Sequence, residues 1–201
     1  MGVSGGAPLP YDAEIEYLEG TGTQYINLGN LGESNKVTFD LMFELSAKEN
    51  NRTLLGGRAS TNTRFCWVLA PGANDEMQVG YGASFTNLSL AMSVGDICKI
   101  ATSISNNRIY YNLYNETQGT ATSTYFTLST FATTDVLLFW NGVLNKAKVK
   151  VRSLVVYNEG DTTHDFIPVR VGQVGHMYDR VGGQLYGNSG TGDFVLGPDK
   201  N

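Results

Sequence analysis

Cysteine and histidine are scarce in this sequence, and their scarcity excludes several kinds of site. The 201 residues include only two cysteines, Cys66 and Cys98, too few for a disulfide framework and not arranged as a zinc site. We expect two reduced, buried thiols, although the sequence leaves a single bridge between them open. Neither histidine, His164 or His176, has the companion residues of a catalytic triad or metal site, so we expect both in solvent-facing loops.

Long apolar runs and a basic charge balance are also missing. No apolar run approaches the roughly 20 residues of a membrane-spanning helix, and residues 1–10 lack the pattern of a secretory signal. Lysine and arginine number 14 against 19 aspartates and glutamates, and the net charge of −5 opposes attraction to nucleic acid and anionic lipid. The one basic run, residues 146–152, carries its charges at alternate positions, as on the solvated face of a strand. We therefore expect neither nucleic-acid binding nor membrane insertion.

Helical periodicity is absent too, and strand periodicity takes its place. No segment keeps a 3.6-residue apolar period over ten or more positions. Apolar and polar residues alternate instead in residues 37–45, 76–81, 97–104, 108–114 and 148–157. In the last segment the alternation predicts that Val149, Val151, Val155 and Tyr157 share one face.

Turn-forming clusters rich in glycine and asparagine separate these segments at the spacing of antiparallel sandwiches. The pattern predicts an all-β protein with two packed antiparallel sheets, a jelly-roll β-sandwich. A closed barrel stays open as an alternative, because alternation does not show where the sheet edges lie. We expect one domain over residues 11–201, preceded by a flexible arm over residues 1–10.

The sequence resembles a known domain family in three segments: residues 11–29 ("YDAEIEYLEGTGTQYINLG"), 54–58 ("LLGGR") and 165–194, which ends "MYDRVGGQLYGNSGTGDF". The pattern is similar to concanavalin A-like, laminin-G-like jelly-roll domains of tailed phages and gut bacteria. This resemblance implies that the two ends of the chain are neighbouring strands that close one sandwich. It places Phe166, Ile167, Tyr178, Tyr186 and Phe194 in the core.

The resemblance also implies a function. It favours a non-enzymatic virion protein, assembled in the bacterial cytoplasm, that decorates a capsid or accompanies a fibre and touches host-surface glycans. The arm would bind other virion proteins, and a homo-oligomer is left open. The alternatives are a carbohydrate-binding module of a secreted bacterial protein, which would act outside the cell or at its surface, and a small glycoside hydrolase.

Exposed aromatic rings beside amides and arginines suit the faces and hydroxyls of sugars, and two sets of residues fit this description. The first set is a row on one predicted strand, Tyr110, Asn112 and Tyr114. The second, looser set comprises Trp67, Arg58, Arg64, Tyr81 and Trp140. For each aromatic residue the alternative is burial against the opposite sheet.

Two further motifs suggest chemistry that we do not expect. Glu14 and Glu16 share a strand face, and a retaining glycosidase needs two carboxyls about 5 to 5.5 Å apart. These glutamates lie in the opening strand rather than in a cleft strand, so we predict no enzymatic activity. Residues 158–165 ("NEGDTTHD") offer oxygen ligands for calcium but lack the spacing of a calcium loop, so no metal or other cofactor is expected.

Overall fold

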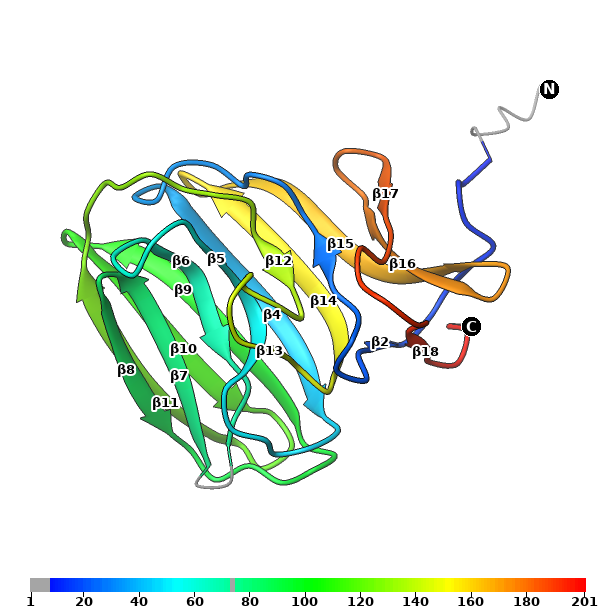
Figure 1. Cartoon of the computed structure of the whole chain (residues 1–201), viewed down its shortest axis with the longest axis horizontal. Helices are drawn as coiled ribbons and strands as arrows, with labels where there is room; N and C mark the ends of the chain where they lie inside the picture. Colours follow the sequence, from blue (N-terminus) through cyan, green and yellow to red (C-terminus); the bar gives the residue numbers. More distant parts are fainter. Residues whose placement is uncertain (1–7, 73–74) are drawn as a thin grey trace.

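The computed structural model describes residues 8–72 and 75–201, and every regular element in these residues is a β-strand. Residues 1–7 of the predicted arm lie outside the described residues. Within the described residues no helix could cross a membrane. Two sheets lie face to face, and the C-terminal strands extend beyond the smaller one (Figure 1). The prediction of an all-β protein with two antiparallel sheets is confirmed, and the chain does not form one closed barrel.

The large sheet has eleven strands. Its main order is β11 (Thr120–Thr127), β10 (Arg108–Asn115), β9 (Ile97–Ser105), β4 (Val37–Leu45), β14 (Val149–Asn158), β15 (Asp161–Val171), β16 (Val174–Asp179) and β17 (Gln184–Tyr186). Three short strands join it: β1 (Ala13–Glu14) pairs with β15, and β2 (Leu18–Glu19) pairs with β14 and β18 (Val195–Leu196).

The small sheet has seven strands. Its order is β3 (Ile26–Asn27), β12 (Leu137–Leu138), β5 (Arg52–Arg58), β6 (Arg64–Leu69), β7 (Glu76–Gly82) and β8 (Ser84–Ser89). The short strand β13 (Asn145–Lys146) runs parallel to β5, and the other pairings are antiparallel.

One core lies between the sheets, and alternation along the strands builds it. In β4 every odd-numbered residue from Val37 to Leu45 is buried, while the intervening residues are half-buried on the outer face. Strand β10 does the same with Ile109, Tyr111 and Leu113. The cysteines belong to this core: Cys66 and Cys98 are free and buried, as expected.

The prediction for β14 was half wrong. Val149 and Val151 are buried in the core as predicted, but Val155 and Tyr157 are only half-buried, and the core residues after Val151 are Leu154 and Val156. The pairing of β14 with β4 shifts register between Val151 and Ser153. Such a bulge inserts one residue and exchanges the inner and outer faces of the strand beyond it.

The two ends of the chain close the sandwich together, as the resemblance implied. Strand β2 lies between β14 and β18, and Ile15 forms an isolated antiparallel bridge with Asp199. Phe194 is 6% exposed, and its ring lies 5.2 Å from that of Phe139. The chain approaches so closely here that a Cβ atom at Gly190 would stand 2.3 Å from the Thr23 carbonyl oxygen.

Two of the five predicted core residues of this closing segment face the other way. Phe166 is fully buried in the core and Tyr186 packs partly against it. Since Phe166 points inward, Ile167 must point outward, and it lies opposite Tyr178 across β15 and β16. Ile167 is buried on the outer side of the sheet, and Tyr178 is half-buried against Tyr11, with ring centroids 5.0 Å apart.

Candidate functional site

The predicted row on β10 lies on the outer face of the large sheet. Tyr110 and Asn112 are half-buried and Tyr114 is 38% exposed, because the alternate residues of β10 point into the core. Tyr110 lies opposite Tyr125 of β11, and their rings are tilted with centroids 5.7 Å apart. Arg108 adds a guanidinium group 4.1 Å from the centroid of the Tyr125 ring. Two aromatic rings and the guanidinium group of Arg108 therefore share this surface.

Asn112 lies between the half-buried Tyr110 and the exposed Tyr114 of β10. Its Nδ2 donates to the Ala101 carbonyl at 3.4 Å, and its Oδ1 accepts no hydrogen bond within residues 8–72 and 75–201. At about 3.3 Å per residue, Tyr110 and Tyr114 are about 13 Å apart along the strand. An extended ligand lying along β10 would meet an aromatic ring, an amide and a second aromatic ring in turn.

A hollow of about 560 Å³ adjoins this row. Its walls include Thr38 and Ser103, and Ser103 lies directly opposite Tyr110 across β9 and β10. Lys36 and Glu159 form a further wall and an ion pair at 3.6 Å. Hydroxyl, ammonium and carboxylate groups thus surround a space beside the aromatic rings, which is the mixture that sugar recognition uses.

The residues of the second predicted set lie in three different places in the structure. Arg58, Arg64 and Trp67 come together on the outer face of the small sheet, where both guanidinium carbons lie 5.6 Å from the Trp67 ring centroid. Trp67 is only 2% exposed, because its neighbours cover it. Tyr81 instead belongs to the core, where it is 3% exposed and its hydroxyl donates to the Ser34 carbonyl at 3.0 Å. Tyr81 is therefore removed from the surface set.

Trp140 also lies apart from that cluster. It follows β12, and its ring packs against Tyr25 at 4.8 Å and Lys146 Nζ at 4.4 Å. Its indole N–H donates to the Leu144 carbonyl at 2.6 Å. These contacts hold the loop between β12 and β13, so its packing gives Trp140 a structural role.

The paired glutamates lie where the sequence places them, on one outward face. Glu14 and Glu16 flank the buried Ile15 and line a hollow of about 340 Å³. Arg152, Arg180 and Lys200 line the same hollow, and Arg152 Nη1 lies 3.8 Å from Glu16 Oε2. The lining therefore mixes three cationic side chains with the apolar side chains of Met42 and Ile167.

Both histidines lie in strands, so their prediction as loop residues was wrong. His176 is half-buried in β16. His164 is in β15, where its ring stacks on Phe166 at 5.3 Å and its Nδ1 lies 2.8 Å from Asp179 Oδ2. No local pattern in the sequence indicates this pair, because the two residues meet only through the β15–β16 hairpin.

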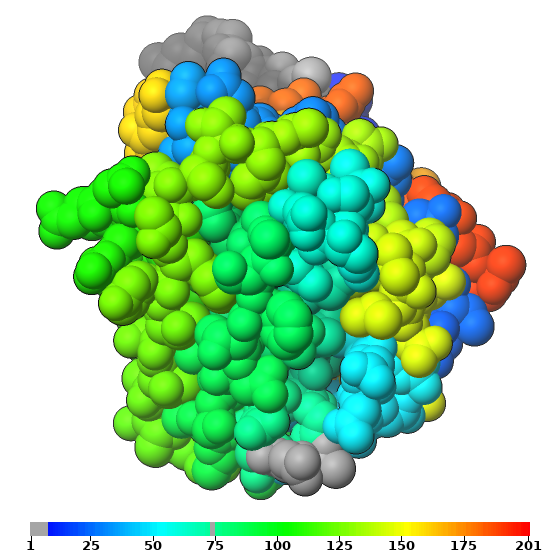
Figure 2. Space-filling model, turned by 60° about the vertical axis from the view of Figure 1, so that its left-hand side comes forward, coloured from blue at the N-terminus to red at the C-terminus, as the bar shows by residue number. Residues whose placement is uncertain are grey.

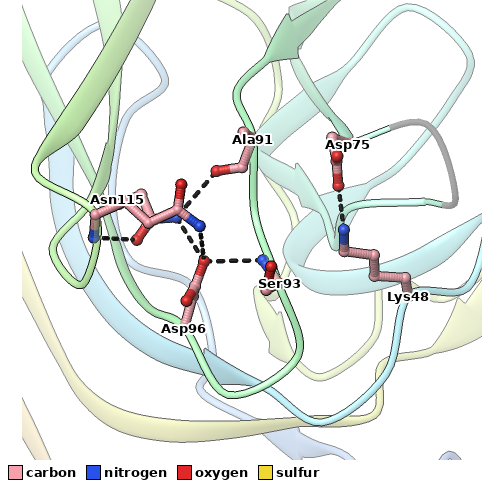
Figure 3. Close-up of polar contacts among 7 residues, drawn as sticks. Lys48, Asp75, Ala91, Ser93, Asp96 and Asn115 are labelled. Carbon is pink, nitrogen blue, oxygen red and sulfur yellow. Dashed lines mark hydrogen bonds and ion pairs between the residues drawn. The ribbon is translucent and has the colours of Figure 1, made fainter.

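A buried carboxylate, Asp96, organises the loop between β8 and β9 (Figure 3). It is 7% exposed and accepts hydrogen bonds from the Ser93 amide at 2.8 Å, Asn115 Nδ2 at 2.7 Å and Gln118 Nε2 at 2.6 Å. The bond from Asn115 is the main reason that the pKa of Asp96 lies below its usual value, and this bond outweighs the opposing effect of burial. Nearby, an ion pair joins Lys48 to Asp75. This network holds loops and is not arranged around a cation.

Metal binding has no geometric support in the described part of the chain, which contains no cluster of three potential ligands. The calcium candidate, residues 158–165, forms the turn of the β14–β15 hairpin, with Glu159 and Gly160 both at positive φ. Asp165 there is paired with Arg180 at 2.6 Å.

Sequence reasoning missed three surface residues, Phe85, Arg108 and Tyr125. Phe85 is 55% exposed and Tyr125 49% exposed, both on strands next to the predicted sets. An aromatic residue in the outward phase of an alternating strand is the available signal, and for Tyr125 it appears in residues 120–127.

Comparisons with known proteins give no family. No protein-family model and no curated protein matches the chain. The enzymatically active domain of tailspike protein 2 from bacteriophage CBA120 is 11% identical with a TM-score of 0.47, over 66% of this chain and 23% of that chain. Scytalido-glutamic peptidase is 13% identical with a TM-score of 0.46, over 71% of this chain and 83% of the peptidase. The chain thus spans about a quarter of the tailspike chain, and such low scores do not place it in a family.

Proposed function

We propose that this chain is a non-enzymatic adhesion module that binds an extended glycan along β10, on the outer face of the large sheet. The observation that carries the proposal is the row of Tyr110, Asn112 and Tyr114, in which no described residue donates to the Asn112 amide oxygen between the half-buried ring of Tyr110 and the exposed ring of Tyr114. In this proposal the sandwich is a jelly roll of the concanavalin A-like, laminin-G-like type.

The chemistry of the row supports sugar binding more than protein binding. Aromatic rings stack on the apolar faces of sugar rings, while Asn112 and the hydroxyls of Thr38 and Ser103 match sugar hydroxyls. The surface is open and shallow, so one domain would bind weakly, and many copies would bind strongly through avidity.

We place such copies on a phage particle, with the arm of residues 1–10 attached to a capsid or fibre protein. Support for this placement comes from the similarity of the opening and closing segments to phage domains. Two prolines, Pro8 and Pro10, favour an extended backbone that could lie along a partner. A carbohydrate-binding module of a secreted bacterial protein would use the same surface.

A glycan array tests the binding surface. The chain should bind a subset of neutral bacterial surface oligosaccharides, and Tyr110→Ala and Tyr114→Ala should each weaken binding at least about tenfold, since stacking on an exposed ring is lost. Tyr178→Ala, at the far end of the same sheet, is the matched control and should bind like the wild type. Wild-type binding by both row variants would refute the proposed surface.

Incorporation into particles tests the placement. Chains with and without residues 1–10 would be supplied to phage that lack the native copy. Incorporation that depends on the arm supports the attachment, and equal incorporation of both forms contradicts it. If the chain never copurifies with virions, the phage placement is wrong, while the glycan surface can still be assessed on the array.

A further inference from the structure

Two arginines that pair with no acidic residue in the described part of the chain face each other on the small sheet. Arg58 and Arg64 are cross-strand neighbours in β5 and β6, and like charges in this position repel. Within residues 8–72 and 75–201, neither forms an ion pair with a carboxylate, although most other arginines do. Burial and the charge of Arg58 both lower the pKa of Arg64. The fold therefore maintains a local excess of positive charge on a protein whose net charge is −5.

Both guanidinium groups also keep unused hydrogen-bond donors. Arg64 Nη1 donates to the carbonyls of Thr61 and Ala83 at 2.8 Å each, which fixes the side chain, while its Nε and Nη2 meet no acceptor in the described residues. Arg58 Nε donates to the Ser60 carbonyl at 3.2 Å, and its two terminal nitrogens likewise meet none. A guanidinium group with free, paired N–H donors is the group that best matches a carboxylate.

A third side chain with an unused donor, Trp67, lies beneath the two arginines. Trp67 is 2% exposed, and its buried Nε1 has no hydrogen-bond partner. The position of a Cβ atom on Gly80 would be 3.2 Å from Trp67 Cδ1, the atom bonded to Nε1, and 2.8 Å from Arg64 Cδ. The pyrrole edge of the indole and the Arg64 stem thus both adjoin Gly80, while the guanidinium groups of Arg58 and Arg64 lie over the indole ring. A buried donor without an acceptor is costly, and because this atom is enclosed by its neighbours a ligand would contact the arginines above it rather than the indole N–H.

An accessible ring and a pair of amides extend this cluster across the sheet. Phe85 lies opposite Gly80, and Arg64 stands 5.0 Å from the centroid of its 55% exposed ring. Further along the same strands Gln78 Nε2 donates to Asn87 Oδ1 at 3.4 Å and Asn87 Nδ2 donates to Glu76 Oε2 at 2.9 Å, and these three residues line a hollow of about 270 Å³. Figure 2 shows this face, with β7 and β8 in front and the segment that follows β5 beside them. The ring of Phe85, the two amides and the hollow thus follow one another along β7 and β8, beginning next to the arginines.

We propose that this face of the small sheet binds an acidic saccharide, with the sugar carboxylate held by Arg58 and Arg64 and the sugar ring resting on Phe85. The positive charges of the two arginines attract the carboxylate, and their unused N–H donors orient it. Phe85 and Gln78 contact the sugar ring and its hydroxyls, which a simple anion does not have. An acidic protein segment would need the same arginines but not an open aromatic ring beside side-chain amides. The site is separate from the row on β10, which lies on the other sheet.

Isothermal titration and tryptophan fluorescence test the site with three probes, fragments of polygalacturonate, hyaluronan and polysialic acid. Each is compared with its methyl ester, which keeps the sugar and removes the charge. At least one acid should bind, its ester should bind at least about tenfold more weakly, and Trp67 fluorescence should change in a Trp140→Phe background, because Arg64 lies against the indole. Binding of acid and ester alike, or of none of the acids, would overturn the proposal.

Variants distinguish binding at this site from binding at the β10 row, and they distinguish a role of Arg58 in binding from a role in folding. Arg58→Gln should lose acid binding at least about tenfold, yet its midpoint of thermal unfolding should be unchanged or higher, because a repulsive neighbour of Arg64 is removed. Phe85→Ala gives a second test that leaves both arginines in place, and Arg108→Gln on the large sheet is the matched control. Retained acid binding by Arg58→Gln and Phe85→Ala would refute the site.

Polyglutamate distinguishes a protein partner. If it binds as tightly as the best acidic saccharide and Phe85→Ala leaves that affinity unchanged, the saccharide assignment is wrong. Tyr110→Ala should keep full acid binding, so that failure of the β10 surface and failure of this site give different results.

Discussion

His164 and Asp179 meet at 2.8 Å across the β15–β16 hairpin, although fifteen residues separate them in the sequence. Asp179 is 1% exposed and also accepts hydrogen bonds from the amides of Asp165 and Val181, each at 3.0 Å. Burial by itself would raise the pKa of Asp179, but these bonds outweigh it and lower the pKa below the ordinary value of 3.8. The pair anchors the turn that leads to the closing strands.

Asp179→Asn should reduce the free energy of unfolding at pH 7 by about 2 kcal/mol, because a buried charged acceptor of three hydrogen bonds is lost. Since the folded pKa is depressed, the unfolded chain takes up the proton at a higher pH than the folded protein. The stabilisation is present above about pH 4 and is lost as the pH falls through the folded pKa. Urea unfolding between pH 2 and pH 7 measures this. Asp161→Asn, in the same hairpin but exposed, is the control, and an equal pH dependence of wild type and Asp179→Asn would contradict the prediction.

Phe194→Ala should reduce the free energy of unfolding by about 3 to 5 kcal/mol, because the ring fills the core between the end of the chain and Phe139. Val195→Ala, whose side chain is 47% exposed, should change it by less than about 0.5 kcal/mol. Chemical denaturation with both variants checks this, and similar values for the two would show that the closing segment is not part of the core.

Removal of residues 184–201 should abolish cooperative unfolding. It takes away β17, β18 and Phe194, and with them the pairing of β2 with β18 and the bridge at Ile15. Calorimetry is the measurement. A truncated chain that melts cooperatively near the wild-type temperature would disprove the role of the closing strands.

The two cysteines should be almost inert in the folded protein. Burial raises the pKa of Cys98 to about 12 and that of Cys66 further, so the reactive thiolate is scarce at pH 8. A thiol reagent should label both cysteines promptly in urea and slowly without it. Complete labelling within seconds under native conditions would contradict their burial.

A broad polysaccharide screen should detect no hydrolysis, because Glu14 and Glu16 face arginines and a lysine. Glu14→Gln and Glu16→Gln provide the decisive comparison. Turnover by the wild type that either substitution abolishes, with folding retained, would identify an enzyme.

The sequence predicted the inner face of a strand correctly where the alternation within that strand alone decides it. Alternation along β4 and β10 predicted their inner faces residue by residue, since each strand repeats the same period from end to end. The prediction failed in β14, because it carried one alternation through the consecutive polar residues Arg152 and Ser153, where the pairing with β4 shifts register and the inward phase moves to Leu154 and Val156. The prediction failed for His164 because residues 161–165 are polar, as in a loop, although they form the start of β15.

The two candidate sites also differ in how far the sequence could predict them. The row Tyr110, Asn112 and Tyr114 follows from one strand, so the sequence could place it. The meeting of Arg58 and Arg64 depends on how β5 pairs with β6, where the register shifts twice. The two arginines were predicted with Trp67 as part of a loose set of glycan-binding candidates, but only the folded protein shows that neither arginine pairs with an acidic residue within residues 8–72 and 75–201.

The bridge between Ile15 and Asp199 has a mechanical consequence. Because the two strands are antiparallel, the chain enters and leaves the sandwich at the same end of this pair. Tension applied between the two ends would open the hydrogen bonds one after another, like a zipper, rather than load them together. A load applied through one end only would pass through that end and leave this pair of segments unloaded, so the geometry of attachment decides whether the pairing bears force.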